Sequence, residues 1–168
     1  PLKDRNGLEQ LFTDERFKPD MLKIYPCMVL KGTELYERYK QGSYKPLTTK
    51  QAARLIAEFK RGVPPYVRIM RVQRDIPTYM TEAGVDRTNL RQYVKQYMDE
   101  HGITCNCIRC REIGRQTKVS GKLTFHSFVY EASGGTEIFI SVDREAALVG
   151  FCRLRFPSMS LREEIGNL

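Results

Sequence analysis

The sequence predicts a protein of the α/β class, in which an α/β region is followed by the first strands of an antiparallel β region. Up to about residue 116, short apolar runs alternate with stretches whose apolar residues recur at helical intervals. Beyond that point the apolar residues recur at every second position, as in antiparallel strands. The charge changes at the same place: residues 1–115 hold 22 basic and 14 acidic side chains, a net +8, whereas residues 116–168 hold 6 of each. The boundary is therefore predicted at 115–121.

Two strands are expected in the α/β region. The run from 22 to 30 is long and apolar enough for one buried strand. Pro26 within it cannot donate a ladder hydrogen bond, so we expect it near an edge or a bulge. A second strand is predicted at 66–73. Because helices are expected between them, the two strands should form a parallel pair with a right-handed crossover.

Helices fill the rest of this region. Residues 1–20 are polar and are expected to form a short helix or a loop. Helices are predicted at 34–40 and, after the capping-box spacing of Thr48-Thr-Lys-Gln51, through Phe59. A further helix is predicted from Thr88, as its cap, to Gly102, which ends it.

The antiparallel region is predicted as a meander of three strands, at 122–131, 138–140 and 147–156, with a turn after the first. Cys152 in the third strand is expected in the core. His126 in the first strand is expected to be an ordinary sheet side chain, since no partner acid or base stands near it in the sequence.

Three of the five cysteines lie within six residues, as Cys105-Asn-Cys107-Ile-Arg-Cys110. Thiolates favour zinc, copper(I) or iron–sulfur, and a loop with this spacing suits a structural zinc. The alternative is three reduced thiols without a common role; disulfides are disfavoured because nothing suggests an oxidising compartment. The fourth ligand is left open between His101, Cys27, a partner domain and water.

Arginines gather at two places. Arg71 and Arg74 are expected at the carboxyl end of the second strand, where α/β folds collect ligands, and Arg109 and Arg111 surround the cysteines. The guanidinium fork suits phosphate, so these four residues are predicted to contact the backbone of a nucleic acid. The alternative is a set of structural salt bridges. No Gly-rich phosphate loop and no apolar run long enough to cross a membrane occurs in the sequence.

Several segments resemble the catalytic subunit of Elongator, a tRNA uridine C5-carboxymethylation enzyme. The most specific is Arg71-Val-Gln-Arg-Asp-Ile-Pro77. The others, in order along the chain, are Leu22-Lys-Ile-Tyr-Pro26, Lys31-Gly-Thr-Glu-Leu-Tyr36, Asn89-Leu-Arg91, Arg111-Glu-Ile-Gly114, Gly134-Gly-Thr-Glu137 and Leu154-Arg155. The resemblance spans about four-fifths of the chain.

The resemblance implies the last βα units of a radical-SAM partial TIM barrel at 1–100, a linker with the Cys-rich metal loop at 101–121, and the first strands of an acetyltransferase-like domain at 122–168. The parent would carry a [4Fe–4S] cluster, S-adenosylmethionine and acetyl-CoA, and would add a carboxymethyl group to C5 of the wobble uridine. The cluster motif and the acetyl-CoA loop of that family have no counterpart here. The chain is therefore expected to be an internal fragment, inactive alone and without catalytic residues.

The resemblance also implies partners and a location. We expect binding to tRNA, with Arg71, Arg74, Arg109 and Arg111 as contacts, and association with the remainder of the parent chain, with a second copy or with Elongator-type partners. We expect no membrane association and a cytoplasmic location. Two other functions stay open: a non-enzymatic, zinc-containing RNA-binding module, and a scaffold between domains.

Overall fold

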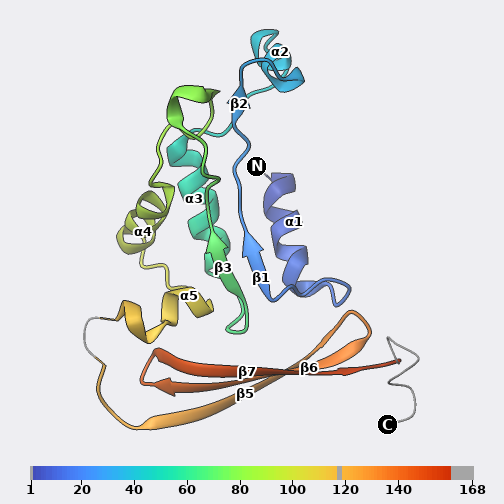
Figure 1. Cartoon of the computed structure of the whole chain (residues 1–168), viewed down its shortest axis with the longest axis vertical. Coiled ribbons are helices and arrows are strands. Elements are labelled where there is room, and N and C mark those ends of the chain that lie inside the picture. Colours follow the sequence, from blue (N-terminus) through green and yellow to red (C-terminus); the bar gives the residue numbers. More distant parts are fainter. Residues whose placement is uncertain (1, 117–118, 160–168) are drawn as a thin grey trace.

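The computed structural model describes residues 2–116 and 119–159, which form an α/β unit and a three-stranded antiparallel sheet lying across one end of it (Figure 1). The helices of the unit are α1 (Leu2–Thr13), α2 (Glu34–Lys40), α3 (Thr49–Lys60) and α4 (Leu90–Glu100). Its strands are β1 (Met21–Lys23), β2 (Val29–Leu30), β3 (Arg68–Arg71) and β4 (Thr81–Ala83), with the 3-10 turn η1 (Thr78–Met80) before β4. The turns α5 (Ile108–Arg111) and η2 (Ile113–Arg115) lead to β5 (Leu123–Ala132), β6 (Gly135–Arg144) and β7 (Ala147–Pro157). The mixed α/β class predicted from the sequence is confirmed.

The parallel strand pair of the α/β unit is β1 and β3. Met21 lies opposite Arg68 and Leu22 opposite Ile69, and Ile69 is fully buried. The helices α2 and α3 lie between the two strands in the chain, so the predicted order of strand, helices and parallel strand is confirmed.

The prediction of one continuous strand from 22 to 30 is wrong. The chain leaves the first strand after Lys23 and pairs again only at Val29, where β2 joins β4 in an antiparallel pair. Pro26 lies between the two pieces and has no backbone N–H to donate, which is a sufficient reason for the ladder to stop there. The strand β4 was not predicted from the sequence.

Helix α3 has the predicted capping box. The Thr48 hydroxyl accepts from the Gln51 backbone N–H, and the Gln51 side chain accepts from the Thr48 backbone N–H. Its buried residues recur at helical spacing: Thr49, Ala52, Ala53, Ile56, Ala57 and Lys60. Helix α4 packs against α3. Its cap position is Asn89 rather than the predicted Thr88.

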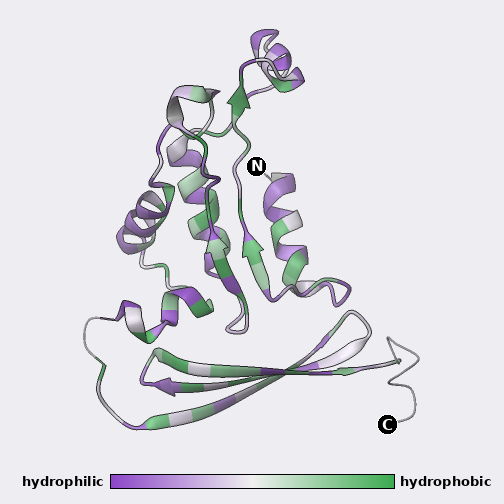
Figure 2. Cartoon of the chain, in the orientation of Figure 1, coloured by the Kyte–Doolittle hydropathy of each residue, from purple (hydrophilic) through white to green (hydrophobic). Residues whose placement is uncertain are grey.

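The predicted meander is confirmed, in the order β5–β6–β7. Figure 2 shows the alternation of hydrophobic and hydrophilic residues along these strands. The face that includes Tyr130 and Phe139 is directed at the α/β unit, and both side chains are buried. Cys152 lies opposite Ile140 on the other face and is exposed, so its predicted place in the core is wrong. Strand periodicity defines two faces but not which of them is covered.

The sheet and the α/β unit share one continuous core. The ring of Tyr66, just before β3, stacks on Tyr130 of β5 with centroids 3.9 Å apart. The Arg153 guanidinium of β7 donates to the Tyr66 carbonyl, and the Ser133 backbone N–H donates to the Glu15 carbonyl at 2.6 Å. Among the described residues, no helix is both long and apolar enough to span a bilayer.

Candidate functional site

The cysteine loop is fixed at both ends by backbone hydrogen bonds. Helix α4 ends at Glu100, and Gly102 just beyond it has a positive φ of 58°, which lets the Ile103 N–H donate back to the Met98 carbonyl at 2.9 Å. At the other end, the Ile108 N–H donates to the Val67 carbonyl, also at 2.9 Å. The loop between these anchors is thereby held against the base of β3.

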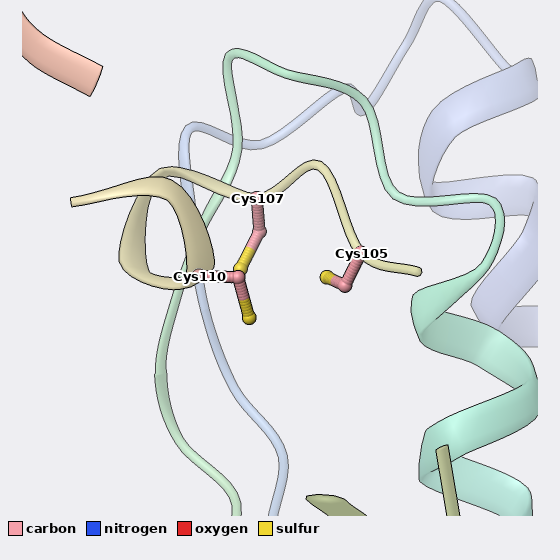
Figure 3. Close-up of side chains that lie close together, drawn as sticks. All are labelled: Cys105, Cys107 and Cys110. Atoms are coloured by element: carbon pink, nitrogen blue, oxygen red, sulfur yellow. The ribbon is translucent and has the colours of Figure 1, made fainter. Parts of the chain in front are cut away.

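The three thiols of this loop point toward one another (Figure 3). Their sulfur atoms all lie within 4.8 Å of one another. Cys107 is fully buried, and Cys105 and Cys110 are half-buried. Three thiolates at about 2.3 Å from one tetrahedral zinc would lie about 3.8 Å apart, so a small contraction of the triangle would let one ion bind all three.

Hydrogen bonds within the triangle shift the pKa values of Cys105 and Cys107 in opposite directions. Hydrogen bonds with Cys105 and Cys110 lower the pKa of the Cys107 thiol strongly. The same bond with Cys107, together with one to Cys110, raises the pKa of Cys105. The three thiols are therefore close enough to influence one another's protonation, and the thiolate is the form in which cysteine binds a metal.

Lys60 also lies in this cluster and was not predicted from the sequence. It is only 3% exposed, and its Nζ donates to the Cys110 Sγ at 3.3 Å. A signal was present in the sequence, because Lys60 follows Ile56 and Ala57 at the spacing of the buried stripe of α3. A lysine at such a position must have an anionic partner within the fold.

Neither residue considered as a fourth ligand joins the triangle. The His101 ring stacks on Tyr97 with centroids 3.9 Å apart, and its Nδ1 lies 2.9 Å from the Tyr97 carbonyl. Cys27 is exposed in the segment between β1 and β2, where Tyr44 is hydrogen-bonded to it. Within the described part of the chain, the cluster of possible metal ligands consists of the three cysteines.

A basic groove of about 590 Å³ lies beside the cysteine loop, between the end of β3 and α4. Its cationic lining residues are Arg71, Arg91, Lys95 and Arg109. Arg71 is paired with Asp75 at 2.5 Å but remains about half exposed. The Nε of Arg109 is buried and has no hydrogen-bond partner in the described structure. Burial, and secondly the nearby Arg109, lowers the pKa of the Arg91 guanidinium, as expected where cations lie close together.

The four arginines predicted as nucleic-acid contacts are therefore not all brought together. Arg71 and Arg109 share the groove, whereas Arg74 is exposed and is not among its lining residues. Arg111 faces the sheet: its Nη1 lies 3.2 Å from both carboxylate oxygens of Asp143, and its Nη2 donates to the Pro65 carbonyl at 3.0 Å. This geometry favours a structural role for Arg111, and its contact with nucleic acid stays a prediction.

Among the described residues, the ion-pair partner of His126 is Asp143. Its Nε2 lies 3.8 Å from Asp143, and its side chain is more than half exposed. Asp143 is already paired with Arg111 and accepts the Ser141 hydroxyl at 3.2 Å. The carboxylate is therefore committed to the contact between the sheet and the α/β unit, and the interpretation of His126 as a sheet side chain stands.

Comparison with known proteins gives consistent matches. Residues 19–100 match the family model of the Radical_SAM C-terminal domain. The chain is 44% identical over 172 residues to a tRNA uridine(34) acetyltransferase of Methanocaldococcus jannaschii, covering 98% of this chain and 32% of that protein. It is 37% identical over 173 residues to human Elongator complex protein 3, covering 98% of this chain and 31% of that protein.

A solved structure agrees with these matches. The archaeal Elp3 of Methanocaldococcus infernus, with an N-terminal deletion, superposes with a TM-score of 0.91 at 42% identity, covering 96% of this chain and 40% of that one. The chain thus spans about a third of the length of the curated relatives it matches.

Proposed function

Because this chain belongs to the family of the tRNA uridine(34) acetyltransferases and Elongator complex protein 3, we propose that it is part of an enzyme that modifies the wobble uridine of tRNA. The finer proposal is that the parent adds a carboxymethyl group to C5 of that uridine. The observation that carries the proposal is the 44% identity over almost the whole chain. The basic groove, which suits a phosphate backbone, supports it independently.

We propose that the chain contributes structure and tRNA contacts to this reaction, and none of the reacting groups. S-adenosylmethionine with a [4Fe–4S] cluster would supply radical chemistry, and acetyl-CoA would supply the carbon unit. The sequence has no Cys-x3-Cys-x2-Cys motif and no Gln/Arg-x2-Gly-x-Gly/Ala loop, so no residue here is assigned to these groups. The chain alone is expected to be inactive.

The division into segments stays a proposal. Residues 1–100 would be the end of the radical-SAM barrel, 101–121 a linker with the metal loop, and 122–168 the first strands of an acetyltransferase-like domain. The match of residues 19–100 to the radical-SAM model and the change to an antiparallel sheet after residue 119 support this division.

The metal would be zinc, held by Cys105, Cys107 and Cys110. Three converging sulfurs on a loop anchored at both ends fit a structural zinc, which needs closely spaced thiolates rather than an open coordination position. Bound there, the ion would fix the backbone that carries Arg109. The metal loop and the basic groove would in this way act as one unit.

tRNA would lie along the groove of Arg71 and Arg109. An anticodon loop offers phosphates for the guanidinium groups and an unstacked base for the reaction. Arg74 would extend the contact surface beyond the groove. Other copies of the chain or Elongator-type subunits could add to this surface, and the names of the eukaryotic relatives support such partners.

The two alternatives explain fewer observations. A zinc-containing RNA-binding module accounts for the cysteines and the charge but not for the match to the radical-SAM model. A pure scaffold accounts for Arg111 and Arg153, which tie the two regions together, but not for the groove lined by Arg71, Arg91 and Arg109.

A chimaera tests the proposal. This chain replaces the matching third of the Methanocaldococcus jannaschii relative, and the nucleosides of treated tRNA are analysed by mass spectrometry. We expect the chimaera to form modified wobble uridine, and the 168-residue chain alone to turn over neither S-adenosylmethionine nor acetyl-CoA. A folded chimaera that leaves the uridine unmodified would contradict the proposed function, and turnover by the isolated chain would contradict its inactivity.

A further inference from the structure

Lys60 is a buried cation without a carboxylate partner in the described part of the chain. It is the last residue of α3 and is 3% exposed. Lysines that form ion pairs elsewhere in the described chain, such as Lys31 and Lys95, are largely exposed and face carboxylates. Burial of an ammonium group without a compensating anion is strongly unfavourable, so the environment of Lys60 needs an explanation.

The groups around the Lys60 ammonium are the thiols of the cysteine triangle. Its Nζ donates to the Cys110 Sγ at 3.3 Å, and it is hydrogen-bonded to Cys105 as well. Helix α3 and the cysteine loop are separate elements, 45 to 50 residues apart in the chain, and the fold brings this one side chain to the sulfurs. The lysine is therefore part of the same site.

We propose that Lys60 is a positioning residue of the metal centre, whose ammonium donates a hydrogen bond to Cys110 and supplies the charge that lets three thiolates hold one divalent ion in a buried site. The inference rests on the metal site of the proposed function. Outer groups that donate hydrogen bonds to metal ligands orient those ligands and tune the ion. Here the donor comes from α3, so metal binding would also lock the cysteine loop to that helix.

The charges of the site favour one kind of metal ion. Three thiolates and one divalent cation carry a net charge of −1, and Lys60 brings the buried site to zero. With Lys60 included, a fourth thiolate would give the site a net charge of −1. A monovalent ion such as copper(I) held by three thiolates would give the same net charge, and burying net charge is unfavourable. Lys60 therefore selects a divalent ion whose fourth ligand is neutral.

The test replaces Lys60 by methionine in the 168-residue chain, with Lys50→Met as the matched control. Lys50 lies on the same helix but is exposed. Zinc affinity is measured by competition with a chromophoric chelator, and the cobalt-substituted proteins are compared through their sulfur-to-cobalt charge-transfer band. We expect Lys60→Met to weaken zinc binding roughly 10- to 100-fold. We also expect its band to move to longer wavelength, because a sulfur without its hydrogen bond donates electrons more readily. Lys50→Met should match the wild type in both.

Methionine is apolar and unbranched, so it fits the buried stripe of α3 and should leave the fold intact. If it does not, Lys60→Gln, which keeps an N–H donor and loses only the charge, provides the same comparison with a smaller expected loss. Unchanged affinity and an unmoved band in whichever variant folds would overturn the inference. A wild-type chain that takes up neither zinc nor cobalt would instead overturn the metal site itself, and the inference with it.

Discussion

Arginines in the α/β unit and arginines in the antiparallel sheet have different partners. In the α/β unit, Arg71 and Arg109 line an open groove. In the sheet, Arg153 donates to the carbonyls of Tyr66 and Asp20, and Arg155 pairs with Glu137. Arg71 and Arg109 line a surface that is open to solvent, whereas Arg153 and Arg155 donate hydrogen bonds to backbone carbonyl groups of the fold.

The difference shows what a net charge can and cannot indicate. Residues 1–115 carry the whole +8 of the chain, and the basic groove lies in that part. Within the region the net charge could not separate Arg109 from Arg111. These residues stand two positions apart on α5, and one lines the groove while the other pairs with Asp143 of the sheet.

The largest effect is expected from removing the metal centre. Replacing Cys105, Cys107 and Cys110 together by serine should reduce zinc content from near-stoichiometric to none, measured by elemental analysis. Amide hydrogen exchange should rise in residues 101–112 and stay unchanged in the strands of the sheet. The reason is that the ion stabilises the cysteine loop beside the groove and makes no contact with the sheet. Protein prepared with zinc that contains no metal would refute the site, and an air-sensitive brown protein would indicate iron–sulfur instead.

The next effect concerns Arg111, which lies in the α/β unit but contacts the sheet. The side chains of Arg111 and Asp143 are 16% and 9% exposed. Arg111→Met should destabilise the chain by roughly 3 kcal/mol, because it leaves the Asp143 carboxylate buried without its partner. Chemical denaturation measures this free energy of unfolding.

Two variants make the Arg111 result specific. Arg115→Met breaks the more exposed pair with Glu112 and should cost about 1 kcal/mol or less. Adding Asp143→Leu to Arg111→Met should recover much of the lost stability, since no charge is then left buried. If Arg111→Met is as stable as Arg115→Met, Arg111 belongs with the groove arginines and not with those of the sheet.

Most of the fold could be predicted because it depends on local patterns. The parallel pair, the capping box of α3 and the antiparallel meander each have a clear sequence signature. The split of the run from 22 to 30 and the strand β4 were missed, because a three-residue Thr-Glu-Ala strand has no periodicity to detect. The exposure of Cys152 depends on which face of the sheet meets the α/β unit, and that is a tertiary property.

The candidate site was predictable to a similar degree. The spacing in the sequence was enough to predict Cys105, Cys107 and Cys110 as one group of metal ligands. In the structure their sulfur atoms lie close enough to bind one ion. The approach of Lys60 required the packing of α3 against the loop, about 50 residues away in the chain. A charged residue on an apolar helical stripe is the sequence signal that indicates such a contact.

The smallest effect is expected for tRNA binding, where several contacts share the affinity. Phosphate contacts release counterions, and for single-stranded contacts the slope of log affinity against log salt changes by about 0.7 for each phosphate lost. Arg71→Ala and Arg109→Ala, introduced into the chimaera described above, should each flatten the slope by about that amount. They should weaken all tRNAs alike, because backbone contacts do not read bases.

Lys122→Ala, at the start of the sheet, is the control and should leave the slope unchanged. Arg74→Ala reports whether the contact surface extends beyond the groove, since Arg74 is exposed but does not line it. If Arg71→Ala and Arg109→Ala leave both affinity and slope unchanged but lower the melting temperature, these arginines act as Arg153 does. The groove arginines would then differ from Arg153 and Arg155 of the sheet only in their exposure to solvent. A scaffold function would replace the proposed tRNA contact for this part of the chain.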